Sequence, residues 1–260
     1  MTEVSGKTLL VTGGGSGIGL GIARAFARAG AKVAIADISL DRAREAAAEL
    51  GGVGVQLDVA EPGAWPAAIA AVEAALGPID ILANSAGIGS GNVPVVEMDE
   101  RWMRRLYEIN LFGAITGMKL VAPGMKARGG GHIINIASSA AVSHVPNQAD
   151  YAGAKAALAM MSECFATEMK ADGVGVTIVC PGRVSTRFKE STEAIIGAKR
   201  RESISPVPKK LMVGDEVGVL VLKAVRKDRL WCFTHPEIEE RVERRWDAMR
   251  GAFAEIPVAV

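Results

Sequence analysis

Two side chains that can exchange a proton lie four residues apart near the middle of the chain. Tyr151 and Lys155 occur in an alanine-rich stretch with helical spacing, where residues four apart project from one face. A tyrosine with an ordinary pKa of about 10 is a poor base at neutral pH, but a neighbouring ammonium stabilises phenolate and lowers that pKa. The pair predicts a proton donor and acceptor for a hydroxyl or carbonyl group, although the same spacing is common on solvated helix faces.

A serine precedes this pair at the end of a predicted strand. Ser138 follows the run His132–Ile136 and stands thirteen residues before Tyr151. A hydroxyl at this place can donate a hydrogen bond to a reacting oxygen and stabilise its developing charge. Ser139, next along the chain, is the alternative.

A glycine-rich turn, Thr12–Gly19, separates the first predicted strand from the first predicted helix. Glycines allow close approach of the backbone to a pyrophosphate, and the N-terminus of the helix offers free N–H groups and positive potential. The spacing departs from G-x-G-x-x-G, so that fingerprint does not apply. The residues predicted to bind the cofactor here are Gly13, Ser16, Gly17, Ile18 and Gly19.

Two aspartates close the next two predicted strands. Asp37 is eighteen residues beyond Gly19, where a carboxylate accepts hydrogen bonds from the adenosine ribose and repels a 2′-phosphate. No Arg or Lys lies in the glycine turn and Ile38 follows the acid, which favours NAD over NADP. Asp58, followed by Val59, is placed to meet the adenine, and a helix N-cap is the alternative for Asp58.

The elements that position these residues alternate between β-branched runs and alanine-rich helical stretches. This alternation predicts an α/β fold, a Rossmann-type doubly wound parallel sheet of about seven strands with helices on both faces. A long helical stretch is expected over Glu97–Lys126. The predicted strands are Thr8–Thr12, Lys32–Asp37, Val53–Leu57, Ile79–Ala83, His132–Ile136, Val174–Val179 and Leu230–Phe233.

The order of these motifs resembles the short-chain dehydrogenase/reductase family, in its single-domain branch, over nearly the whole chain. Its T-G-x-x-x-G-x-G stands at Thr12–Gly19, its N-N-A-G at Asn84–Gly87 and its P-G segment at Pro181-Gly182. Its asparagine, serine, tyrosine and lysine match Asn110, Ser138, Tyr151 and Lys155. The sequence departs from the family where Ser85 replaces the second asparagine and where Ala141-Val142 follows the serines.

The resemblance implies a division of labour among these residues. Tyr151 would be the general acid/base, and Lys155 would bind the nicotinamide ribose and lower the tyrosine pKa. Ser138 would position the substrate oxygen, and Asn110 would hold a water that links Lys155 to solvent. The further residues that the resemblance places along the cofactor are Asn84, Ala86, Gly87, Pro181, Gly182, Val184 and Thr186.

Composition limits the remaining possibilities. The 260 residues suit one domain (1–260), 49% are hydrophobic and the formal net charge is +1, so nucleic acid is not an expected partner. Three separated cysteines and three isolated histidines predict neither a disulfide framework nor a metal site. The chain shows no signal peptide and no apolar run long enough for a membrane, so the cytoplasm is expected. A homotetramer or dimer is an expectation from the family alone.

The predicted reaction is hydride transfer between NAD and a secondary alcohol or ketone. The segment 185–212 has little periodicity, and we expect it to be a loop that forms a mobile flap over the substrate. The pocket walls look apolar to mixed, which favours a medium-sized hydrophobic or alicyclic substrate, while contacts from His144, Arg183 or Arg187 stay open. The alternatives are a non-catalytic NAD-binding sensor or scaffold, which would not need the tetrad, and an epimerase or dehydratase, which the glycine spacing disfavours.

Overall fold

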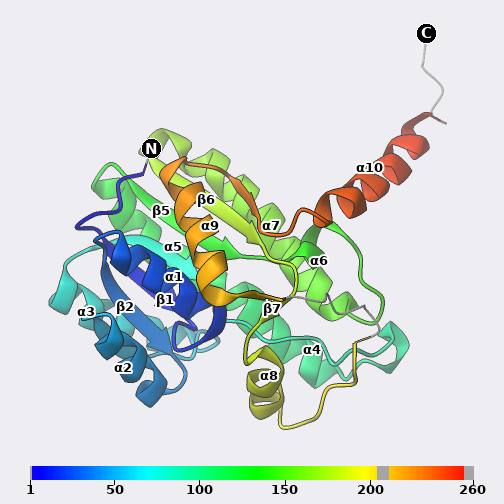
Figure 1. Cartoon of the computed structure of the whole chain (residues 1–260), viewed down its shortest axis with the longest axis horizontal. Coiled ribbons are helices and arrows are strands. Elements are labelled where there is room, and N and C mark those ends of the chain that lie inside the picture. The colour runs from blue at the N-terminus through cyan, green and yellow to red at the C-terminus, as the bar shows by residue number, and fades with distance from the viewer. Residues whose placement is uncertain (1, 204–210, 255–260) are drawn as a thin grey trace.

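Seven parallel strands form one sheet in the computed structural model, which describes residues 2–203 and 211–254 (Figure 1). Their order across the sheet is β3-β2-β1-β4-β5-β6-β9. The strands are β1 (Thr8–Thr12), β2 (Lys32–Asp37), β3 (Val53–Gln56), β4 (Ile79–Asn84), β5 (Gly131–Ile136), β6 (Val174–Cys180) and β9 (Trp231–Phe233). The predicted α/β fold is confirmed, and the β-branched runs gave each strand to within one residue at either end.

Helices cover both faces of this sheet. Helices α1, α2 and α9 pack on one face around a core that includes Ile22, Phe26 and Val221, and helices α3, α5 and α7 pack on the other around Trp65 and Met125. The bounds are α1 (Gly17–Arg28), α2 (Leu40–Glu49), α3 (Trp65–Leu76), α4 (Glu100–Tyr107), α5 (Gly113–Ala127), α6 (Ser139–Val142), α7 (Ala149–Met169), α8 (Phe188–Ile196), α9 (Gly214–Arg226) and α10 (Ile238–Ala254). Helix α10 projects from the body (Figure 1).

The strand order reverses between β1 and β4, because β2 and β3 lie on one side of β1 while β4, β5 and β6 follow on the other. In open parallel sheets, ligands bind outside the carboxyl ends of the strands at such a point. The glycine turn leaves β1 at this edge, and Ser138 leaves β5 at the same edge. The fold therefore brings the predicted cofactor and catalytic motifs together.

Two stretches differ from the sequence prediction. The helical stretch expected over Glu97–Lys126 begins at Glu100 and is interrupted by a π-helical turn, Glu108–Phe112, between α4 and α5. The segment expected to be a loop contains α8, and its two ends pair as the short parallel strands β7 (Val184–Ser185) and β8 (Met212–Val213). The remainder of that flap, 204–210, lies outside the described residues. Within the described residues, no helix is both long and apolar enough to cross a bilayer.

Candidate active site

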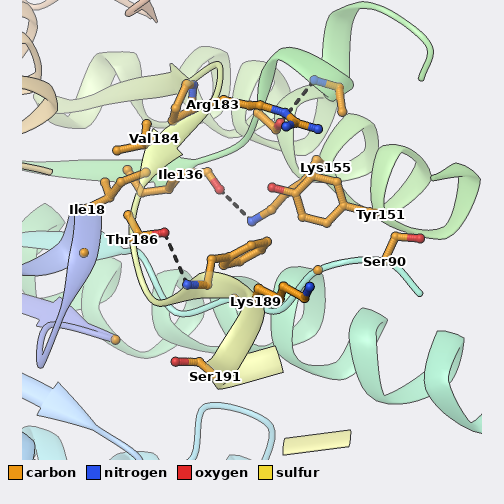
Figure 2. Close-up of a pocket in the computed structure, with 18 of the residues that line it drawn as sticks. Ile18, Ser90, Ile136, Tyr151, Lys155, Arg183, Val184, Thr186, Lys189 and Ser191 are labelled. Atoms are coloured by element: carbon orange, nitrogen blue, oxygen red, sulfur yellow. Dashed lines mark hydrogen bonds between the residues drawn. The ribbon is translucent and has the colours of Figure 1, made fainter. Parts of the chain in front are cut away.

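A cavity of about 930 Å³ lies at the carboxyl edge of the sheet and receives nearly all the predicted site residues. Figure 2 shows Tyr151, Lys155 and Arg183 converging on one part of it, with Ile18, Val184 and Thr186 nearby. The predicted residues in its wall are Gly13, Ser16, Gly17, Ile18, Gly19, Asp37, Ile38, Asp58, Val59, Ala86, Gly87, Ser138, Tyr151, Lys155, Pro181, Gly182, Val184 and Thr186. Asn84 and Asn110 are buried and do not line the cavity.

The glycine turn has the features needed to bind a dinucleotide pyrophosphate. Gly13 has φ +61°, and a Cβ on it would come within 2.8 Å of the Ala86 Cα, so the turn can lie this close to β4 only as glycine. Ser16 is the N-cap residue of α1, and among the described residues its side chain makes no capping hydrogen bond. The N–H groups of the first turn are therefore free to face the cavity. These observations fit the phosphates of a nicotinamide dinucleotide.

Asp37 is held at the end of β2 by three donors. Its Oδ2 accepts a hydrogen bond from the Gly15 N–H at 3.1 Å, and its Oδ1 accepts from the Ser39 N–H at 3.0 Å and from Arg42 Nη2 at 3.2 Å. The carboxylate therefore has a fixed position at the cavity wall. Arg42, which sequence reasoning did not weigh, places a guanidinium directly beside it.

Asp58 is not a helix N-cap, because the next helical elements have Glu61 and Ala64 in that position. Its Oδ1 accepts from the Ala60 N–H at 3.0 Å, a turn-stabilising bond, and its Oδ2 pairs with Arg105 Nη2 at 2.6 Å. The residue also lines the cavity beside Val59. A contact with adenine remains a prediction.

Tyr151 extends from α7 into the cavity, where it is half-buried. Burial raises the pKa of Tyr151 above its ordinary value, while a hydrogen bond with Ser138 and the positive charge of Arg200 oppose that rise. The expectation that Lys155 lowers the tyrosine pKa stays a prediction, because the net direction here is set by burial. The Lys155 Nζ is 5.9 Å from the centroid of the Tyr151 ring.

Lys155 is buried on the same face of α7, one turn beyond Tyr151. Its Nζ donates to the Ile136 carbonyl oxygen at 2.7 Å, where β5 ends (Figure 2). Burial lowers the pKa of Lys155 to about 8. The ammonium therefore has a fixed position in the cavity wall, from which it can bind ribose hydroxyls.

The two predicted asparagines use their amides within the protein. Asn110, in the π-helical turn, accepts from the Ile88 N–H at 2.8 Å and donates to the Ile88 carbonyl oxygen at 2.7 Å. Asn84 donates to the carbonyl oxygen of Ala114 at 3.3 Å and to Asn135 Oδ1 at 2.8 Å. The side chain of Asn84 therefore links β4 to β5 and α5, and it does not line the cavity.

The segment after β6 is fixed by a histidine that sequence reasoning treated as isolated. His235 Nδ1 accepts from the Gly182 N–H at 3.1 Å, so its Nε2 carries the proton and donates to the Arg183 carbonyl oxygen at 3.1 Å. Pro181, Gly182, Val184 and Thr186 then pass along the cavity wall. His235 therefore positions the backbone predicted to surround the nicotinamide.

The structure also adds cavity residues that the sequence did not reveal. Phe188, at the start of α8, meets Tyr151 edge-on with ring centroids 6.1 Å apart. Arg200 follows α8 and places its guanidinium 5.9 Å from the Phe188 ring. Neither residue belongs to a motif of the sequence. Phe188 reaches the cavity because α8 packs against Tyr151 of α7.

The comparisons with known proteins agree with this geometry. The family model described as short chain dehydrogenase matches residues 7–195. Relatives include EphD of Mycobacterium tuberculosis, 35% identical over 86% of this chain, although the chain spans only 40% of that protein's length. Another is the 2-keto-3-deoxy-L-fuconate dehydrogenase of Xanthomonas campestris, 40% identical over 71% of this chain and 61% of its own.

A solved structure extends the similarity over the whole fold. A short chain dehydrogenase/reductase from Burkholderia phymatum in complex with NAD has a TM-score of 0.87 and 25% identity, with 100% of both chains covered. The family match over residues 7–195 and the similarity to relatives and solved structures show that the chain belongs to the short-chain dehydrogenase/reductase family.

Proposed function

We propose that this protein oxidises a secondary alcohol with NAD, or reduces the corresponding ketone in the reverse direction. One observation carries the proposal: Tyr151, Ser138 and Lys155 meet in the wall of the same cavity as the uncapped N-terminus of α1. A proton-transfer group thus lies beside a dinucleotide-binding turn. Bound NAD would supply the hydride acceptor, or in its reduced form the hydride donor.

The chain's own residues would move the proton and hold the reacting oxygen. Ser138 and Tyr151 line the same cavity and interact closely enough for Ser138 to oppose the rise in the Tyr151 pKa, so an oxygen bound between the two hydroxyls would be fixed by both. Because burial raises the pKa of Tyr151, its phenol is protonated at neutral pH and suited to donate to a ketone oxygen. Alcohol oxidation needs the phenolate and should become faster as the pH rises.

Lys155 and the segment after β6 would orient the cofactor. Lys155 Nζ has one described bond, to Ile136, and retains protons for ribose hydroxyls. Asp37 would receive the adenosine ribose, and its negative charge supports NAD over NADP. Asn110 lies next to Lys155 around Gly87, where a Cβ would be 3.1 Å from Asn110 Oδ1 and 3.6 Å from Lys155 Nζ. This proximity supports the predicted proton relay.

The test is turnover with a panel of secondary alcohols and NAD⁺, followed by the absorbance of reduced nicotinamide. In Tyr151→Phe we expect kcat to fall by about 10²- to 10⁴-fold, the usual range for a general acid/base. Tyr107→Phe is the matched control, because Tyr107 is the other tyrosine of the chain and does not line the cavity. NAD⁺ binding, measured by calorimetry, should persist in both variants.

Two results would contradict the proposal. Equal losses in the two tyrosine variants would show a folding effect and remove Tyr151 from the chemistry. Tight NAD⁺ binding without turnover of any alcohol or ketone would favour a sensor or scaffold.

A further inference from the structure

The cavity wall near Tyr151 is rich in positive charge. Besides Arg42 and Lys155, its described cations are Arg183, Arg187, Lys189, Arg200, Arg201 and Arg241. Three of these charges are already compensated by carboxylates, in the pairs Arg187–Glu190, Lys189–Glu202 and Arg201–Glu97. Arg183, Arg200 and Arg241 form no ion pair with any carboxylate in the residues that the structure describes.

Arg200 is fixed by a hydrogen bond and a ring contact, and no carboxylate pairs with its guanidinium among the described residues. Its Nε donates to the Ser90 carbonyl oxygen, and its guanidinium lies 5.9 Å from the Phe188 ring centroid. Its backbone N–H donates to Glu193 Oε1 at 3.0 Å, which fixes the residue at the end of α8. This anchoring holds the charge where it is and reduces the ordering cost of binding a ligand.

Gly89 provides the room for this guanidinium. A Cβ at Gly89 would come within 2.9 Å of both Cζ and Nη2 of Arg200, so any larger residue would displace the charge. Gly89 is thus packed against both Arg200 and Phe188, whose Cε1 would also be 2.9 Å from such a Cβ.

The charge of Arg200 acts at the reaction centre. Burial lowers the pKa of Arg200, the neighbouring Tyr151, Glu193 and Asp150 oppose that effect, and the like charge of Arg183 adds to it. Arg183 itself points into the cavity beside Tyr151 and Lys155 (Figure 2). Arg183 and Arg200 thus line the same cavity as Tyr151, and neither has a carboxylate partner among the described residues. A bound anion would stabilise both positive charges in this partly desolvated place.

We propose that the substrate is a hydroxy acid, with a carboxylate that is bound by Arg200 and Arg183 while its carbinol group faces Tyr151. A planar guanidinium matches a carboxylate through paired hydrogen bonds. The hydrophobic or alicyclic body expected from the sequence would lie between the two groups. This inference rests on the proposed dehydrogenase function and names the substrate class for the same site.

The carboxylate takes no part in the bond changes. In the oxidation, the carbinol C–H bond breaks and its electron pair leaves as hydride to oxidised nicotinamide, while the hydroxyl proton passes to the Tyr151 oxygen. The acid group leaves unchanged on the keto acid. Its contribution is orientation, because it fixes the distance of the carbinol from the anion site.

The kinetic test compares 3-hydroxycyclohexanecarboxylate with its methyl ester, which has the same body without the charge. We expect wild-type kcat/KM to favour the acid by about 10- to 100-fold, the worth of a charge-assisted pair. Arg200→Met should lose that factor for the acid only, and Arg200→Lys should recover part of it. The matched control is Arg201→Met, because the adjacent Arg201 lines the same cavity but is paired with Glu97 at 2.9 Å.

A binding measurement separates this inference from the proposed function. Cyclohexanecarboxylate, which cannot react, is titrated calorimetrically into the wild type, Arg200→Met and Arg201→Met without cofactor. Binding that is lost only in Arg200→Met supports the anion site even if no alcohol is oxidised. Equal rates with acid and ester, or equal carboxylate binding by all three proteins, would overturn the inference while leaving dehydrogenase activity intact.

Discussion

We predict that the choice between NAD and NADP depends on one carboxylate and one guanidinium at the end of β2. Asp37 Oδ1 and Arg42 Nη2 are 3.2 Å apart, and only 8% of the Asp37 side chain is exposed. Arg42 Nε is buried without a hydrogen-bond partner among the described residues. We therefore predict that Asp37→Ser converts an NAD site into one that accepts NADP, because it removes the repelling charge and releases Arg42.

The expected size of this change follows from the interactions exchanged. A hydrogen bond between a guanidinium and a phosphate contributes about 2 kcal/mol, which is roughly a 30-fold change in affinity. Asp37→Ser should raise kcat/KM for NADP⁺ by about this factor, while the loss of the ribose acceptor lowers kcat/KM for NAD⁺. The fold should lose roughly 1 to 3 kcal/mol, because the Gly15 and Ser39 N–H groups lose their acceptor.

The assay is initial velocity against each cofactor at saturating alcohol, with thermal unfolding measured in parallel. The double variant Asp37→Ser/Arg42→Met is the control and should lose the gain for NADP⁺. A wild type that prefers NADP⁺ would refute the assignment of Asp37. An equal gain in the double variant would refute the role of Arg42.

Three further predictions concern buried groups. In Lys155→Met, turnover should fall by at least about 100-fold. Burial lowers the pKa of Lys155 from 10.5 to about 8, so the free-energy cost of burying the charged lysine is full below pH 8 and disappears towards pH 10.5. Denaturant titrations should therefore show the stability of the wild type rising in that window by up to about 3 kcal/mol, and that of the variant should not rise. Burial lowers the pKa of His132 from 6.5 to about 4, so the contribution of neutral His132 to stability is complete above pH 6.5 and is lost as the pH falls towards 4. His132→Gln should reduce the loss of unfolding free energy between pH 6.5 and pH 4 by about 3 kcal/mol. An unchanged loss in the variant would contradict the burial of a neutral His132. His235→Phe removes the partners of the Gly182 N–H and the Arg183 carbonyl, so the KM for NAD⁺ should rise by roughly tenfold with kcat less affected; an unaltered KM would show that this segment does not need His235.

The sheet could be predicted closely because its strands are buried on both faces. Runs such as Thr8–Thr12 and Lys32–Asp37 are apolar in their interiors, and polar residues stand at their ends. The glycine turn and the acid Asp37 follow directly from this register. The positions of Tyr151 and Ser138 also depend on local spacing, so their meeting at one sheet edge was predictable.

The flap was not predictable in the same way. Helix α8 has nine residues, too few for its apolar period to stand out, and β7 and β8 have two residues each. Their structure depends on contacts with distant segments. Arg200, for example, is held by Ser90, which lies 110 residues away in the chain. A charge that enters the site through tertiary contacts leaves no local pattern.

Electrostatics was the other gap. The i, i+4 spacing places Tyr151 and Lys155 on one face, but it does not indicate how much water each loses on folding. Burial raises the tyrosine pKa and lowers the lysine pKa, and the spacing of the two residues indicates neither direction. The ion pair between Arg42 and Asp37 was also missed. It forms because the Arg42 side chain extends from α2 to the end of β2, which no local pattern indicates.

The central claim is direct hydride transfer from a carbinol to nicotinamide with Tyr151 as the acid/base. It is tested most directly with a substrate that carries deuterium on the carbinol carbon and with NAD⁺ as acceptor. We predict that deuterium is recovered in the reduced nicotinamide, that none reaches solvent, and that Tyr151→Phe suppresses this transfer while Tyr107→Phe does not. Deuterium released to water, or transfer that persists unchanged in Tyr151→Phe, would contradict the claim.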